Sequence, residues 1–177
     1  MATTAANVRV GVTGGAFHAP AATTLPTNST TALAAGYLEV GYISEDGITQ
    51  SISSDVTDIK AWQNGDVVRK VQTSHDLTYQ FTMIETSAES LKVYYADADA
   101  SLTAVEVTGD QSPREVWVLE VADGVNDIRI VLPDAQVTER GDVSYKNDEA
   151  IAYPVTITAY PDSSGVKAYI YMDATSD

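Results

Sequence analysis

Apolar and polar residues alternate along most of this chain with the period of two that is typical of β-strands. The clearest case is LTYQFTMI at residues 77–84, where Leu77, Tyr79, Phe81 and Met83 alternate with polar side chains. This alternation predicts a strand with one face in the core and one face in water. Further strands are expected at residues 7–12, 37–43, 48–53, 114–122, 126–132, 135–140, 150–160 and 166–173.

Three segments carry more specific signals about the sheet. REVWVLEVA at residues 114–122 is apolar on both faces, which indicates a central strand. SEDG, which ends in Gly47, is a turn-type sequence between the strands expected at 37–43 and 48–53. Pro154 cannot donate to a strand ladder, so we expect it at a sheet edge or at a bulge near the start of its strand.

One segment, TSAESLKVYYADA at residues 86–98, departs from the strand pattern. Thr86 and Glu89 have the spacing of a capping box, which marks the start of a helix. Three apolar residues then fall on one helical face: Ala88, Leu91 and Tyr95. The sequence therefore predicts a mainly β fold, a β-sandwich or barrel with one flanking α-helix at about residues 86–97.

The first 36 residues differ in composition from the rest of the chain. They are rich in Ala and Thr and show little sustained periodicity beyond the short strand expected at 7–12. Such a stretch is either a flexible tail or an arm that becomes ordered on a partner. We therefore divide the chain into an extended N-terminal arm, residues 1–36, and a β-sandwich domain, residues 37–177.

Composition excludes several classes of function. The chain has 177 residues and a net charge of −15, so its surface repels nucleic acid. It has no cysteine, and its two histidines, His18 and His75, lie in different segments without His-rich or Cys neighbours, so we expect no metal, cofactor or catalytic residue. No apolar run approaches the roughly 20 residues of a membrane span. Without a signal-peptide pattern, synthesis in a cytoplasm is expected.

Three blocks of the sequence share an order and spacing with a known family. They are GYISEDGITQSIS at 41–53, DIKAWQNGDVVRKVQTS at 58–74 and LTYQFTMIETSAESLKVYY at 77–95. Together they resemble the major tail tube proteins of long, non-contractile-tailed bacteriophages (siphoviruses), above all those that infect actinobacteria. The resemblance is strongest over residues 37–96 and looser over YPVTITAYPD at 153–162.

The resemblance implies a structural, self-assembling virion protein that is not an enzyme. In that family a β-sandwich with a flanking helix joins five other copies in a hexameric ring, and rings stack into a hollow tube for genome ejection. The resemblance also implies a tape measure protein and a tail terminator as partners, with viral DNA passing through unbound. Polar strand faces are the candidates for the lumen: Thr49, Ser51, Ser53, Thr78, Gln80 and Thr82.

The segment DIKAWQNGDVVRKV, residues 58–71, is the candidate for contact between subunits. It holds one of the two tryptophans, three of the ten basic residues and Asn64-Gly65, a pair typical of a two-residue hairpin turn with positive φ at both positions. Tryptophan is the residue type most enriched among binding hot spots. The contact candidates are Lys60, Trp62, Asn64, Gly65, Asp66, Arg69 and Lys70; the alternative is that Trp62 is ordinary core and the charges are solvated.

Other functions stay open at this point. A tube protein of a contractile tail, a bacteriocin or a secretion system shares the sandwich and the ring. A capsid decoration protein or a carbohydrate-binding module is a further alternative, in which Tyr169 and Tyr171 stack on sugar rings, although these side chains also fit the wet or subunit-facing side of a final strand. An enzyme ranks below these alternatives.

Overall fold

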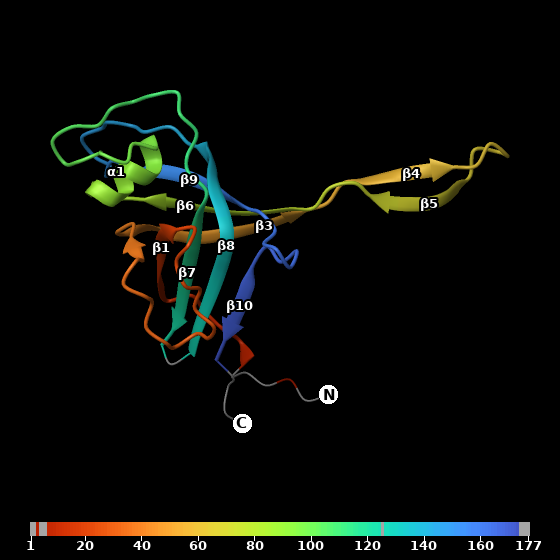
Figure 1. The fold of residues 1–177 in the computed structure, drawn as a ribbon, viewed down its shortest axis with the longest axis horizontal. Helices are drawn as coiled ribbons and strands as arrows, with labels where there is room; N and C mark the ends of the chain where they lie inside the picture. Colours follow the sequence, from red (N-terminus) through yellow and green to blue (C-terminus); the bar gives the residue numbers. More distant parts are fainter. Residues whose placement is uncertain (1–2, 4–6, 125, 174–177) are drawn as a thin grey trace.

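The computed structural model describes residues 3, 7–124 and 126–173, and within these the chain forms ten strands and one helix (Figure 1). Their order along the chain is β1 (Thr13–Pro20), β2 (Leu38–Glu39), β3 (Ile43–Ser53), β4 (Val56–Lys60), β5 (Val67–Gln72), β6 (Asp76–Met83), α1 (Ala88–Tyr95), β7 (Glu115–Asp123), β8 (Asn126–Arg140), β9 (Tyr153–Ala159) and β10 (Tyr169–Met172).

Eight strands form one antiparallel sheet in the order β2-β1-β7-β8-β9-β6-β3, with β10 paired to β8. The long strand β8 makes the sheet fold over on itself. Its first half pairs with β7 and β10, and its second half, from Ala135 onward, pairs with β9. The rings of Trp117 on β7 and Phe81 on β6 meet at 6.2 Å, so the two halves of the sheet face each other. The predicted mainly β sandwich with one flanking helix is confirmed.

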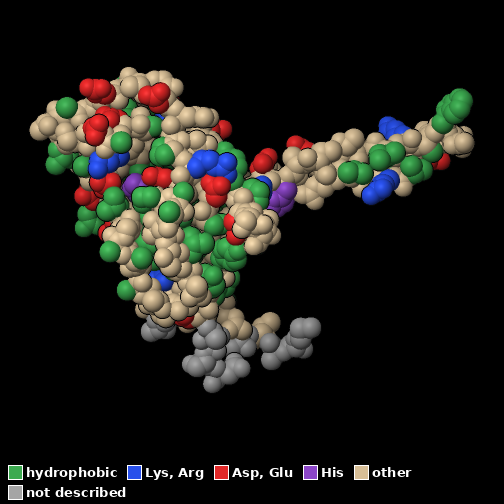
Figure 2. All heavy atoms as spheres, viewed as in Figure 1, with side chains coloured by type: hydrophobic (Ala, Val, Ile, Leu, Met, Phe, Trp, Pro, Cys, Tyr) green, Lys and Arg blue, Asp and Glu red, His purple; other side chains and the backbone are tan. Residues whose placement is uncertain are grey.

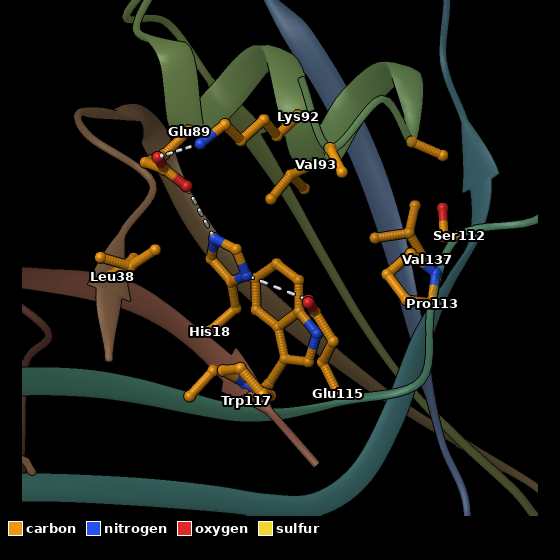
Figure 3. A pocket seen from close by; sticks show the side chains of 14 residues that line it. His18, Leu38, Glu89, Lys92, Val93, Ser112, Pro113, Glu115, Trp117 and Val137 are labelled. Atoms are coloured by element: carbon orange, nitrogen blue, oxygen red, sulfur yellow. Dashed lines mark hydrogen bonds and ion pairs between the residues drawn. The ribbon is translucent and has the colours of Figure 1, made fainter. Parts of the chain in front are cut away.

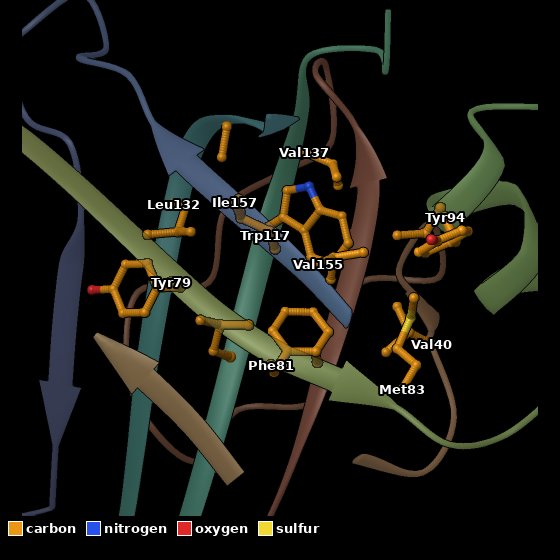
Figure 4. Packing of buried hydrophobic residues seen from close by; sticks show 14 of the residues in the cluster. Val40, Tyr79, Phe81, Met83, Tyr94, Trp117, Leu132, Val137, Val155 and Ile157 are labelled. Carbon is orange, nitrogen blue, oxygen red and sulfur yellow. The ribbon is translucent and has the colours of Figure 1, made fainter. Parts of the chain in front are cut away.

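The core fills the space between these two layers and is covered at one end by α1 (Figures 1 and 4). The alternation predicted for 77–84 is correct, because Leu77, Tyr79, Phe81 and Met83 are all buried on β6. Strand β7 lies between β1 and β8 and is buried on both faces, as expected of a central strand. Helix α1 contributes Leu91, Val93 and Tyr94 to the same core.

Tyr79 places a polar hydroxyl group inside the hydrophobic core. Its side chain is fully buried, and its hydroxyl has no hydrogen-bond partner among the described residues. In Figure 4 the hydroxyl points away from the surrounding apolar side chains. Burial raises the pKa of Tyr79 to about 12, because the phenolate is disfavoured away from water.

Replacing Tyr79 with Phe is therefore expected to leave the free energy of unfolding at neutral pH unchanged, or to raise it by up to about 1 kcal/mol. The unfolded chain releases the phenol proton from about pH 10, whereas the folded state keeps it to about pH 12. Stability thus falls with pH across this window, and Tyr79→Phe should reduce the fall. Urea unfolding at several pH values measures both effects. Tyr42→Phe, at a 76% exposed position, is the control; a clear loss of stability in Tyr79→Phe alone would contradict the interpretation.

The sequence predicts a turn at SEDG and a break between the strands at 126–132 and 135–140, and in both places one strand continues instead. SEDG lies inside β3, where Ile43 pairs with Met83 and Ile48 pairs with Phe81. Both flanks pair with the same strand, so the extra residues form a bulge, with Gly47 at φ 67°. The segments expected at 126–132 and 135–140 are likewise one strand, β8, and Pro133 lies at a register shift against β7.

Pro154 lies at the second residue of β9, near the start of the strand as predicted, but not at a sheet edge. Strand β9 pairs with β6 on one side and β8 on the other. Gly141 N–H donates to the Pro154 carbonyl at 2.9 Å, so the proline still contributes an acceptor to its neighbour. The edge expectation is wrong because the missing N–H is tolerated at the strand terminus.

Helix α1 is shorter than predicted and begins from a different cap. The N-cap is Ser87 rather than Thr86, and the capping box joins Ser87 to Ser90 rather than Thr86 to Glu89. Ser90 N–H donates to Ser87 Oγ at 3.1 Å, and Ser87 N–H donates to Ser90 Oγ at 2.9 Å. A serine at the third helical position satisfies the same backbone groups that Glu satisfies in the usual box.

Ser87→Ala is expected to lower the free energy of unfolding by about 0.5–2 kcal/mol, because it removes the acceptor for the Ser90 N–H. Ser87→Thr keeps a capping hydroxyl and should lose much less. Thermal unfolding of the two variants side by side measures the difference. Equal stabilities would show that the hydroxyl does not cap α1.

The N-terminal region is more integrated with the domain than an extended arm would be. The strand expected at 7–12 is instead β1 at Thr13–Pro20, which pairs with β7 in the main sheet. Gly14 permits this pairing, because a Cβ there would lie 2.3 Å from the Glu120 carbonyl oxygen. The buried Arg129 on β8 then donates to the carbonyls of Asn28 and Thr31, which holds this part of the chain on the sheet.

Candidate assembly surfaces

The segment singled out in the sequence forms a hairpin that projects from the body. Strands β4 and β5 pair only with each other, and Figure 1 shows the hairpin extending well beyond the sandwich. Asn64 and Gly65 have φ values of 60° and 71°, so both have positive φ as predicted. The turn itself is longer than the two residues predicted, because the closing hydrogen bond runs from Ala61 N–H to the Asp66 carbonyl at 2.8 Å.

The hairpin is unusually apolar for a segment with no core of its own. Trp62 at its tip is 98% exposed, which rules out the alternative that it belongs to the core of its own subunit. Four more large apolar side chains on the hairpin are exposed as well: Val56, Ile59, Val67 and Val68. Exposed large apolar side chains gathered on one projecting element mark a site of interaction.

The hairpin also differs from the rest of the chain in charge. Residues 54–74 contain three acidic and three basic residues, so this segment is neutral in a chain of net charge −15. Lys70 pairs with Asp58 at 3.1 Å, whereas Lys60 and Arg69 form no ion pair with any described residue. Figure 2 shows the basic side chains on both sides of the hairpin, where they are open to a partner.

The six lumen candidates lie together on one face of the β3–β6 pair. The register pairs Thr49 with Gln80 and Ser51 with Thr78, with Ser53 and Thr82 toward the two ends. The row continues onto β9, where Thr156 lies opposite Gln80 and Thr158 lies opposite Thr78. The opposite face of the same strands lies against the core, so the structure brings the candidates into one polar surface.

The outer face of the other layer is covered by the chain itself. Val116, Val118 and Val131 point away from the sandwich core and are nonetheless no more than 1% exposed. The segment held by Arg129 lies over this layer. The β3–β6–β9 surface is therefore the open sheet face among the described residues.

The two tyrosines of the carbohydrate-binding alternative are not an open aromatic platform. Tyr169 and Tyr171 are half-buried, and the Tyr169 hydroxyl donates to Asp162 Oδ2 at 2.7 Å. Their neighbours Ile170 and Met172 are exposed instead. The predicted alternation along β10 is present, but its apolar side is the one that faces outward.

A pocket lies at the end of the body that carries α1 (Figure 3). We call it the α1 pocket; it has a volume of about 240 Å³ and is lined by residues including His18, Leu38, Val93, Ala98, Pro113 and Trp117. The imidazole of His18 stacks on Trp117, and its Nδ1 lies 3.0 Å from Glu115 Oε2. No pattern in the sequence predicts this cluster, because its members are far apart along the chain.

The described residues offer no site for metal chemistry. None of their His, Asp and Glu side chains gather in groups of three or more that could hold an ion. Within the same part of the chain, no helix is both long and apolar enough to cross a bilayer.

Comparison with known proteins decides the family. A sequence model described as phage tail tube protein matches residues 1–176. This chain belongs to the phage tail tube protein family. The tail tube family is structural rather than enzymatic, and its members are parts of virion tails or phage-like particles. No curated protein matches the sequence of this tail tube protein.

Solved structures of tail-like particles are similar in fold to this tail tube protein. A chain of the sheath–tube complex of the extracellular contractile injection system PVC has a TM-score of 0.52 at 8% identity, covering 98% of this chain and 100% of that chain. The cap of the anti-feeding prophage tube has a TM-score of 0.48 at 10% identity, and the match covers 98% of this chain and 100% of that chain. The tail of an empty gene transfer agent particle has a TM-score of 0.40 at 7% identity, and the match covers 98% of this chain and 100% of that chain. The first of these likenesses supports the shared fold.

Proposed function

We propose that this protein is the major tail tube subunit of a long, non-contractile phage tail. Six copies form a ring, and stacked rings form the hollow tube through which the genome leaves the capsid. The observation that carries the proposal is the β4–β5 hairpin, which pairs with no other strand among the described residues.

The hairpin requires a binding surface for a physical reason. An isolated two-stranded hairpin is at best marginally stable in water. This one exposes Trp62 and four β-branched residues, and it lies beyond the reach of the sandwich core. Burial of these side chains against a neighbouring subunit stabilises both the hairpin and the assembly.

The polar face of β3, β6 and β9 is the proposed lining of the tube. Its side chains are hydroxyls and amides, among them Thr49, Ser51 and Gln80, and these carry no positive charge. A lining without Lys or Arg lacks the groups that hold phosphate by displacing counterions. Viral DNA therefore passes without specific binding.

The proposal includes the setting in which the subunit works. The protein is synthesised in the cytoplasm of the host bacterium and ends in the tail of the virion. A tape measure protein inside the tube and a tail terminator at its end are the expected partners. The hairpin, together with the part of residues 1–36 that lies outside β1, supplies contacts to neighbouring copies.

A second candidate is the tube protein of a contractile tail or injection system. The likeness in fold to a chain of a sheath–tube complex favours it. The sequence blocks at 41–53, 58–74 and 77–95 favour the non-contractile tail. A sheath gene beside the gene for this protein would decide for the contractile system, and its absence would decide against it.

Assembly of the purified protein tests the proposed function. We expect the wild-type chain to sediment as hollow tubes as its concentration rises. In the matched variant, Asn-Gly replaces residues 56–72, because Thr73 N–H already donates to the Asp55 carbonyl at the hairpin base. This variant should fold and remain unassembled. Wild-type protein that stays monomeric under all polymerising conditions would overturn the proposal.

A further inference from the structure

The α1 pocket holds two buried polar atoms that lie near each other but form no hydrogen bond with any described residue. His18 Nε2 and Glu89 Oε2 lie 3.6 Å apart, and neither has a hydrogen-bond partner among the described residues. The His18 side chain is only 9% exposed. A buried acceptor without a donor is costly, and a donor from outside the subunit would remove that cost.

The size and lining of the α1 pocket suit an aromatic side chain. A dry cavity of about 150 Å³ is enough to hold benzene, and the α1 pocket has about 240 Å³. Its wall contains Leu38, Val93, Pro113 and the ring of Trp117. The occupant therefore combines a large flat apolar body with one hydrogen-bond donor, which describes an indole.

Charge around the α1 pocket complements the hairpin. The charged residues that line the α1 pocket are Glu89, Glu115 and Lys92, and the segment 93–113, both ends of which line the pocket, adds four acidic residues and no basic one. Lys60 and Arg69 flank the hairpin tip and form no ion pair with any described residue. Figure 2 shows acidic side chains with some basic ones at the α1 end of the body, and basic side chains on the hairpin.

We propose that Trp62 of one copy inserts into the α1 pocket of a second copy, with its indole N–H directed at Glu89 Oε2, the carboxylate oxygen that accepts no hydrogen bond from the described residues. The hairpin and α1 lie at opposite ends of the subunit (Figure 1), so one chain cannot fill its own pocket. The contact joins two different surfaces and leaves a free hairpin and a free pocket at the ends. Such a head-to-tail contact propagates, as stacking of rings requires. The inference rests on the proposed tube function and names the partner surface of the hairpin.

Site-directed cross-linking tests this contact, because the chain contains no native cysteine. The double variant Gln63→Cys/Leu38→Cys places one thiol beside Trp62 and one at the rim of the α1 pocket. Assembled protein treated with a short bis-maleimide should give a ladder of covalent dimers, trimers and higher species. Mass spectrometry should find the peptides around residues 63 and 38 linked. If Leu38→Cys fails to fold, Ala98→Cys on the pocket wall replaces it.

The control is Gln63→Cys/Ser164→Cys, which has its second thiol in an exposed turn outside the α1 pocket. The inference is supported if assembled tubes give a ladder of cross-linked species when the second cysteine is at position 38 or 98, and give none when it is at position 164. Tubes that give no ladder with 38 or 98, or an equal one with 164, overturn it and leave the tube function standing. Absence of tubes from the wild-type protein overturns the function itself, so the two failures are distinct.

Discussion

Subunits that carry Trp62→Ala are expected to fold like the wild type and to lose assembly. Trp62 is 98% exposed in the single subunit, so its removal takes no contact from the core. In the tube, a tryptophan at the centre of an interface contributes about 2 kcal/mol or more when truncated. The concentration needed for assembly should therefore rise by about 30-fold or more.

Two measurements on the same preparation check this result. The melting temperature by circular dichroism should match that of the wild type, and sedimentation should show free subunits at concentrations where the wild type forms tubes. Gln63→Ala, one residue away in the same loop, is the matched control and should assemble nearly normally. Normal assembly of Trp62→Ala would show that the tip is not a contact. Loss of folding would contradict the exposed position of this side chain.

The other tryptophan should behave in the opposite way. Trp117 is 1% exposed and lies between the rings of Phe81 and His18, with centroid distances of 6.2 and 5.3 Å. Trp117→Ala leaves a cavity at the meeting point of the two layers, and such truncations cost about 3–5 kcal/mol. Against a typical domain stability of about 5–15 kcal/mol, this loss is large.

Urea unfolding measures the effect of Trp117→Ala. The midpoint should fall sharply, and any assembly defect should follow from loss of the folded subunit. Trp117→Phe keeps an aromatic ring in the core and should lose clearly less stability. Equal stability of Trp117→Ala and the wild type would mean that the layers do not meet at this side chain.

The contrast between the two tryptophans shows what the sequence could not supply. Hydrophobicity alone does not distinguish a tryptophan in the core from a tryptophan at an interface. Trp117 falls in a run that is apolar on both faces, which predicted its central strand. Trp62 falls beside an Asn-Gly turn and three basic residues, which pointed to a hairpin but left its burial open.

Errors in the predicted strands have a common physical cause, which is pairing between distant segments. SEDG has the composition of a turn, yet both of its flanks pair with β6, so it forms a bulge. Strand β1 was missed because its Ala and Gly residues are weak strand formers, while Ala16 and Ala19 are buried only through pairing with β7. By contrast, the alternation at 77–84 predicted its strand correctly without any knowledge of the segments that pair with it.

The candidate surfaces were predicted to different degrees. The alternation along β6 and the polar residues of β3 predicted a row of polar side chains on each strand. The register between the two strands places both rows on one face of the sheet. The α1 pocket could not be predicted, because His18, Glu89 and Glu115 come together from β1, α1 and β7. Only the fold places them within contact of one another.

A cryo-electron microscopy map of the assembled protein would show the hairpin and the polar sheet face in place. We expect a hollow tube of stacked six-subunit rings, with each β4–β5 hairpin running onto a neighbouring copy and the β3–β6–β9 face lining the channel. Particles that remain single subunits at high concentration, or a tube whose hairpins stand free in solvent, would contradict it.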